Sequence, residues 1–81
     1  MFEIVGIQSV SFVGKDKNKV EGISLFCIDQ SYENPALVGH RAERIFLPAS
    51  KGYTVHSFAV GDLVHVSYNR YGKPEAVNAL V

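Results

Sequence analysis

The apolar residues of the chain recur in short segments that alternate with polar residues and are separated by glycine-containing turns. Segments of this kind, rich in β-branched and aromatic residues, predict strands rather than helices. The pattern gives a first strand over Phe2–Val13, a polar turn at residues 14–19, and a second strand over Val20–Asp29 that returns as a hairpin partner. Residues 30–36 have the composition of a loop.

The segment Leu37–Leu47 admits two interpretations. It contains helix formers, and Leu37, Arg41 and Arg44 stand at helical spacing. We favour a strand, because Gly39 would cost about 1 kcal/mol inside a helix and because two sets of residues alternate up to Pro48. The first set is Ala42, Arg44 and Phe46, and the second is Glu43, Ile45 and Leu47.

Two further strands follow a connection at residues 48–59. Gly61 and Asp62 supply a turn, and the strand "LVHVSY" then alternates, with Val64, Val66 and Tyr68 on one face. The turn "NRYGK" contains Gly72, which can adopt a positive φ angle. The last strand runs from Pro74 or Glu75 to Val81, with Val77, Ala79 and Val81 on one face. We expect the core or its edges to contain Ile23, Leu25, Phe46, Val64, Val66, Tyr68 and Val77.

Five short strands in a single domain over residues 1–81 predict an all-β fold, a small antiparallel barrel that is closed or nearly closed. An open sheet would leave exposed edges and one uncovered apolar face. Three strands, a connection and a two-stranded hairpin follow the order of an OB-like barrel. An SH3-like barrel is the alternative, since it also uses a Gly-Asp turn before a strand.

Composition limits the ligands that the whole molecule can attract. The eight Lys and Arg residues balance the eight Asp and Glu residues, so attraction to nucleic acid or anionic lipid must be local. Cys27 is the one cysteine, which excludes an intrachain disulfide or a multi-cysteine zinc site. It lies in an apolar segment. Residues 1–10 lack the pattern of a secretion signal or membrane span, so we expect a cytoplasmic protein.

The C-terminal hairpin carries a resemblance. Its residues 60–73, "VGDLVHVSYNRYGK", resemble the hairpin of small uncharacterised β-barrel proteins encoded by phages and conjugative elements of Gram-positive bacteria. The upstream segment "VEGISLFCI" matches their glycine-bearing second strand. The resemblance implies an accessory protein of a mobile element. Small barrels of such elements are similar to single-stranded DNA-binding proteins, and the family offers no catalytic motif.

An OB-like barrel binds nucleic acid with its second and third strands and with the turns that follow its first and fourth strands. Those places hold seven of the eight basic residues together with an aromatic ring that can stack on a base. The candidate nucleic-acid-binding residues are Lys15, Lys17, Lys19, Arg41, Arg44, Arg70, Tyr71 and Lys73. Tyr32 and Tyr53 are further stacking candidates. Nearby acidic residues reduce the local charge, and the alternative is a set of ordinary solvated turns.

Catalysis has less support in the sequence. His40, His56 and His65 are far apart and form no metal-binding or nucleophile motif, and no cation neighbours Cys27 to activate its thiol. We therefore expect a non-catalytic binding protein without metal or cofactor. The alternative function is a protein-interaction or assembly module, with a homodimer formed through an edge strand. The first strand suits that role because Glu3 is its one ionised side chain.

Overall fold

The computed structural model describes residues 1–80 and contains one antiparallel sheet of five strands in the order β3-β2-β1-β4-β5. The five strands are β1 (Phe2–Val13), β2 (Lys19–Asp29), β3 (Arg41–Pro48), β4 (Leu63–Tyr68) and β5 (Pro74–Ala79). The predicted all-β fold with five antiparallel strands is confirmed. Predicted strand residue Val81 lies outside the described residues.

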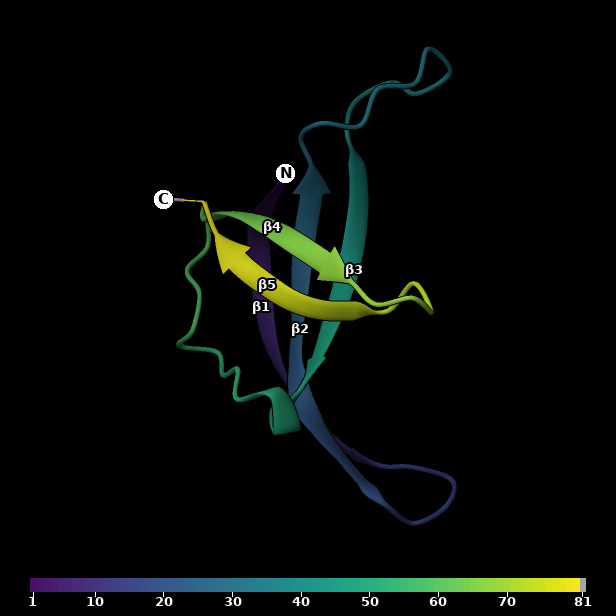
Figure 1. The fold of residues 1–81 in the computed structure, drawn as a ribbon, viewed down its shortest axis with the longest axis vertical. Helices are drawn as coiled ribbons and strands as arrows, with labels where there is room; N and C mark the ends of the chain where they lie inside the picture. Colours follow the sequence, from purple (N-terminus) through teal and green to yellow (C-terminus); the bar gives the residue numbers. More distant parts are fainter. Residues whose placement is uncertain (81) are drawn as a thin grey trace.

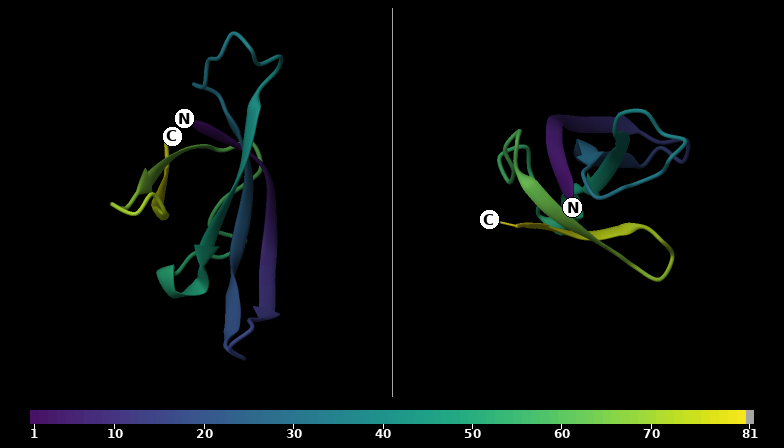
Figure 2. Two further views of the ribbon diagram at one scale, coloured as in Figure 1. Left: turned by 90° about the vertical axis from the view of Figure 1, so that its right-hand side faces the viewer. Right: turned by 90° about the horizontal axis from the view of Figure 1, so that it is seen from above.

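Two layers make up the molecule. Strands β1, β2 and β3 lie side by side along its long axis, and the β4–β5 hairpin crosses in front of them (Figure 1). The hairpin stands off to one side of the three-stranded layer in the side view (Figure 2). Strand β4 pairs with β1 only at Phe2 and Glu3, so the sheet bends sharply at this point and folds its apolar face onto itself.

The core fills the space between the two layers. Register places residues of β2 and β3 that share a face directly opposite each other, as in the pairs Leu25–Ile45 and Ile23–Leu47. Val64 and Val66 of β4 and Val77 of β5 cover this face and are buried. The cluster consists of Ile4, Ile23, Leu25, Cys27, Ile45, Leu47, Val64, Val66 and Val77.

Of the seven residues expected in the core or at its edges, five are buried, and the other two are aromatic. Tyr68 lies at the rim of the core, where burial raises its pKa and the nearby carboxylate of Glu43 adds to the increase. The prediction that Phe46 belongs to the core or its edges is wrong. Phe46 pairs with Ser24 on the opposite face of β3, because Ile45 and Leu47 are the residues that point inward.

The predicted barrel is not closed. No ladder joins β3 to β5 among residues 1–80, although the two strands approach each other. The reason is geometric, since the short strand β5 lies across β3 rather than alongside it (Figure 1), and strands must run alongside each other to form a ladder. Both strands therefore keep a free edge, and an open seam separates them.

Strand β3 begins four residues later than Leu37, the start that the sequence suggested. The Asn34 side chain accepts a hydrogen bond from the backbone N–H of Ala36 at 2.9 Å, and the Asn34 carbonyl accepts one from Leu37 at 2.9 Å. Gly39 follows with a φ of 95°. A local turn therefore uses the backbone groups that a longer strand would have needed.

The hairpin is attached to the first layer by the Gly-Asp turn. Gly61 has a φ of 97°, and its N–H donates to the carbonyl of Ile4 at 2.7 Å. The Ile4 N–H in turn donates to the carbonyl of Asp62 at 2.9 Å. Between β3 and this turn, Ala49–Lys51 form a short 3₁₀ helix.

Gly22 provides a test of the packing between β2 and β3. A Cβ atom there would overlap the carbonyl oxygen of Leu47 and lie 2.8 Å from two ring carbons of Phe46. Gly22→Ala should lower the free energy of unfolding by about 1–3 kcal/mol, the usual cost of overpacking, in urea denaturation. Gly6→Ala is the matched control, since its Cβ would meet only the Phe26 ring, at 3.3 Å. Equal effects of the two substitutions would contradict this packing.

Candidate nucleic-acid interface

The open seam forms a groove of about 570 Å³ between β3 and the β4–β5 turn. We call it the β3–β5 groove. It combines three cationic side chains with apolar surface, and its lining contains no acidic residue. The lining residues are Arg44, Phe46, Pro48, Lys51, Asn69, Lys73 and Pro74.

The positive charge of the β3–β5 groove is not neutralised by ion pairs. Two salt bridges form within residues 1–80, and neither involves Arg44, Lys51 or Lys73. Three cations near one hollow repel each other unless an anion is bound, so the β3–β5 groove presents a local positive potential on a molecule of zero net charge. The groove is therefore suited to an anionic ligand.

An aromatic surface adjoins these cations on the outward face of β2 and β3. Phe26 lies directly opposite Arg44 in the ladder and is 38 % exposed. The Phe46 ring lies over Gly22 and reaches the β3–β5 groove. Sequence reasoning missed Phe26 and Lys51, and it assigned Phe46 to the core or its edges. The alternation of Ala42, Arg44 and Phe46 was the signal that could have placed Phe46 outside.

The β4–β5 turn is held by Asn69. The Asn69 side chain accepts hydrogen bonds from the N–H groups of Tyr71 at 2.9 Å and Lys73 at 3.1 Å. Gly72 has a φ of 76°, as the sequence predicted. Arg70 lies over the Tyr71 ring at 5.1 Å from its centroid, and Tyr71 is 72 % exposed. The turn thus directs Lys73 into the β3–β5 groove and presents a cation and an aromatic ring to solvent.

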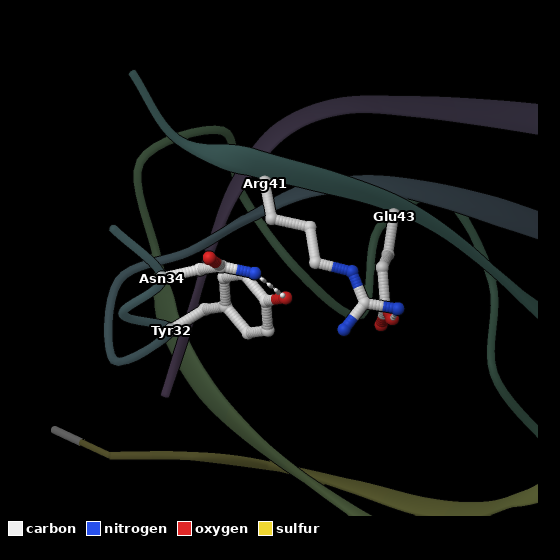
Figure 3. Close-up of polar contacts among 4 residues, drawn as sticks. All are labelled: Tyr32, Asn34, Arg41 and Glu43. Carbon is white, nitrogen blue, oxygen red and sulfur yellow. Dashed lines mark hydrogen bonds and ion pairs between the residues drawn. The ribbon is translucent and has the colours of Figure 1, made fainter. Parts of the chain in front are cut away.

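Arg41 lies at the other end of β3 and is already engaged. Its guanidinium makes an ion pair with Glu43 at 3.0 Å and lies over the Tyr32 ring at 5.0 Å from the centroid (Figure 3). Asn34 donates to the Tyr32 hydroxyl at 3.2 Å. Because Arg41 already covers a face of Tyr32, this cluster of four residues joins the β2–β3 loop to β3. It is less suited than the groove to binding an external anion.

Lys15 and Lys17 lie in the turn at the tip of the β1–β2 hairpin, and Lys19 begins β2. All three are away from the β3–β5 groove (Figure 1). Lys19 pairs with Glu21 at 2.9 Å. Hydrogen bonds from the backbone and side chain of Asn18 lower the pKa of Asp16, so a carboxylate persists between Lys15 and Lys17. The tip therefore carries a weaker local charge than its lysine count implies.

Tyr53 is held in a structural position. It is half-buried, packs against the core and stacks on Phe58 with ring centroids 5.6 Å apart. The Tyr53 hydroxyl accepts a hydrogen bond from the N–H of Val77 at 3.3 Å, which fixes the connection to β5. The expected role of Tyr53 in stacking on a base does not fit this placement.

The eight predicted binding residues thus fall into three separate places. Arg44 and Lys73 line the β3–β5 groove, with Arg70 and Tyr71 beside it on the turn. Arg41 lies at the far end of β3, and Lys15, Lys17 and Lys19 lie on the hairpin tip. Among residues 1–80 no group of His, Cys, Asp and Glu side chains is arranged to hold a metal ion.

No protein-family model, curated protein or solved structure matches the chain. The resemblance of residues 60–73 to proteins of phages and conjugative elements therefore stays a prediction. No helix within residues 1–80 has the length and apolar character needed to cross a membrane.

Cys27 allows a test of the core, to which it belongs. Burial raises the pKa of its thiol to about 11, with a further contribution from the carboxylate of Glu43. Because a raised thiol pKa lowers the thiolate fraction at a given pH, Cys27 should react with a thiol reagent far more slowly in the folded protein than in urea, from neutral pH to pH ~9. Labelling followed by mass spectrometry measures both rates. Similar rates in the two states would show that Cys27 is accessible.

Proposed function

We propose that the protein is a non-catalytic binding domain that holds single-stranded nucleic acid in the β3–β5 groove. The observation that carries this proposal is the combination of Arg44, Lys51 and Lys73 with Phe46 in one hollow without an acidic residue. Cations contact phosphates, and aromatic faces stack on bases that are free of a complementary strand.

The strand arrangement supports an OB-like identity over an SH3-like one. The chain forms a three-stranded meander, then a connection with a short 3₁₀ helix, then a final hairpin. Strand β1 pairs with both β2 and β4. OB folds are partly open barrels that bind oligonucleotides on their second and third strands and on the turn between the fourth and fifth. Arg44, Phe46 and Lys73 occupy corresponding places.

In this proposal the single-stranded nucleic acid runs along β3 and under the β4–β5 turn. Arg44, Lys51 and Lys73 bind phosphates, Phe46 and Phe26 stack on bases, and Arg70 with Tyr71 closes over the bound strand from the turn. Arg41, Lys15, Lys17 and Lys19 contribute only to long-range attraction. A role in a mobile element rests on the resemblance of the hairpin alone.

The decisive measurement is a fluorescence-anisotropy titration with labelled oligothymidine at several salt concentrations, with oligouridine in parallel to compare DNA with RNA. The double substitution Arg44→Gln, Lys73→Gln should weaken binding by about tenfold or more for each of the two lost contacts, because a hydrogen bond to a charged group contributes roughly 1.5–3 kcal/mol. The slope of log affinity against log salt should fall by about 1.4, because each single-strand phosphate contact contributes about 0.7.

Lys15→Gln, Lys17→Gln is the matched control, since it removes the same charge from the hairpin tip. It should change the affinity much less than the substitutions in the groove. An equal loss would assign binding to overall charge instead. A larger loss for Arg70→Ala, Tyr71→Ala than for Arg44→Gln, Lys73→Gln would move the binding site to the exposed turn, and absence of binding at low salt would reject the proposal.

Phe46→Leu separates stacking from charge. The substitution keeps an apolar side chain over Gly22 but removes the aromatic face. The free energy of binding to oligothymidine should become less favourable by about 1–3 kcal/mol, the contribution of one stacked base. The slope of log affinity against log salt should stay unchanged. Circular dichroism checks that the variant is folded. A changed slope with unchanged affinity at low salt would contradict stacking on Phe46.

A further inference from the structure

Strand β1 has a free edge over most of its length. It pairs with β2 along its whole course, but on its other side it pairs with β4 only at Phe2 and Glu3. The next backbone hydrogen bonds on that side join Ile4 to the Gly61–Asp62 turn. Residues 53–55 of the connection line a pocket with Ser9–Ser11, but they make no backbone hydrogen bond to them. Among residues 1–80, no backbone hydrogen bond outside the β1–β2 ladder involves Val5–Val13. We call this segment the free edge of β1.

The free edge of β1 lacks the features that prevent pairing with another chain. Natural edge strands are protected by charged side chains, proline or a bulge along the edge. Residues 4–14, "IVGIQSVSFVG", contain no charged residue and no proline, and the bulge lies at Val5, where the free edge begins. Phe12 is 54 % and Val13 is 67 % exposed. A long, uncharged edge with exposed apolar side chains favours pairing with another strand.

We propose that the free edge of β1 pairs with the same edge of a second copy of the chain, antiparallel, about a twofold axis at Ser9. The axis follows from the length of the edge, because Ser9 is the midpoint of Val5–Val13. Paired residues must point to the same face of a continuous sheet. A twofold axis at Ser9 satisfies this rule and gives the pairs Gly6–Phe12, Ile7–Ser11, Gln8–Val10 and Ser9–Ser9.

Both ends of the edge support a second copy as the occupant. The pair Gly6–Phe12 brings the exposed Phe12 ring beside Gly6 and the Phe26 side chain that lies over it, and cross-strand aromatic pairs stabilise a sheet. Glu3 and Asp62 lie at one end of the edge. The turn beyond the other end contains Lys15, Asp16 and Lys17, which together carry a net positive charge. Antiparallel pairing brings the lysines of each copy to the carboxylates of its partner, which is a complementary arrangement of charge.

The dimer would join two three-stranded layers into one sheet in the order β3-β2-β1-β1-β2-β3. Because the twofold axis is perpendicular to the sheet, the outward faces of both copies lie on the same side. The proposal does not depend on nucleic-acid binding, since none of the residues of the β3–β5 groove belongs to β1.

Cross-linking tests the register directly. Ser9→Cys, in a Cys27→Ala background, should form a disulfide-linked dimer on mild oxidation, since residues opposite each other in a ladder meet the distance requirement of a disulfide. Ser11→Cys is the matched control on the same strand and face. Its two copies would be about 13 Å apart, at four residues of about 3.3 Å each, and should not cross-link. If Cys27→Ala fails to fold, the wild-type thiol can be retained, because Cys27 is only 1 % exposed.

Sedimentation velocity of the wild-type chain should show a dimer that Ser9→Lys converts to a folded monomer, because that substitution places two ammonium groups at the twofold axis. A wild-type monomer throughout the micromolar to millimolar range would overturn the proposal. Cross-linking of Ser11→Cys as readily as Ser9→Cys would also overturn it. Oligothymidine titration of Ser9→Lys separates the two proposals, since the monomer should still bind if the β3–β5 groove is the nucleic-acid site.

Discussion

The fold depends on the packing of the β4–β5 hairpin over the apolar face of β1, β2 and β3. That face contains Ile23, Leu25, Ile45 and Leu47, and without the hairpin it would be exposed to water. Burying apolar side chains stabilises a folded state by about 25 cal/mol per Å², and in so short a chain few other contributions of this size exist. The two hydrogen bonds between Ile4 and the Gly61–Asp62 turn position the hairpin for this packing.

The same packing explains why the sheet stays open. A hairpin that crosses the three-stranded layer can cover its apolar face, but it cannot run alongside β3 and complete a ladder (Figure 1). The resulting seam is where cationic and aromatic side chains from β3 and from the β4–β5 turn meet. The β3–β5 groove is thus a consequence of how the core is covered.

The free edge of β1 has a related origin. Because β4 begins opposite Glu3 and runs antiparallel past Phe2, the rest of β1 has a paired strand on one side only. The molecule therefore offers two different surfaces, a charged groove that suits a polyanion and an uncharged strand edge that suits another strand. Their separation allows nucleic-acid binding and self-association to be examined independently.

Local physical chemistry is sufficient to predict most of the strands, since alternation and glycine-containing turns depend on neighbouring residues alone. The sequence thus determined β1 and β4 correctly and gave β2 to within a residue of its start. It also determined the turn at Gly72 and placed Cys27 in an apolar segment, which is buried in the structure at that residue. For the candidate interface, the sequence identified the cations Arg44 and Lys73. It could not show which cations are engaged in ion pairs or cation–π contacts within the protein. The tertiary structure decided that Arg41 pairs with Glu43, that Tyr53 packs against the core, and that Phe46 and Lys51 line the groove. These outcomes depend on how the hairpin crosses β3, and that crossing is set by contacts between residues far apart in the chain.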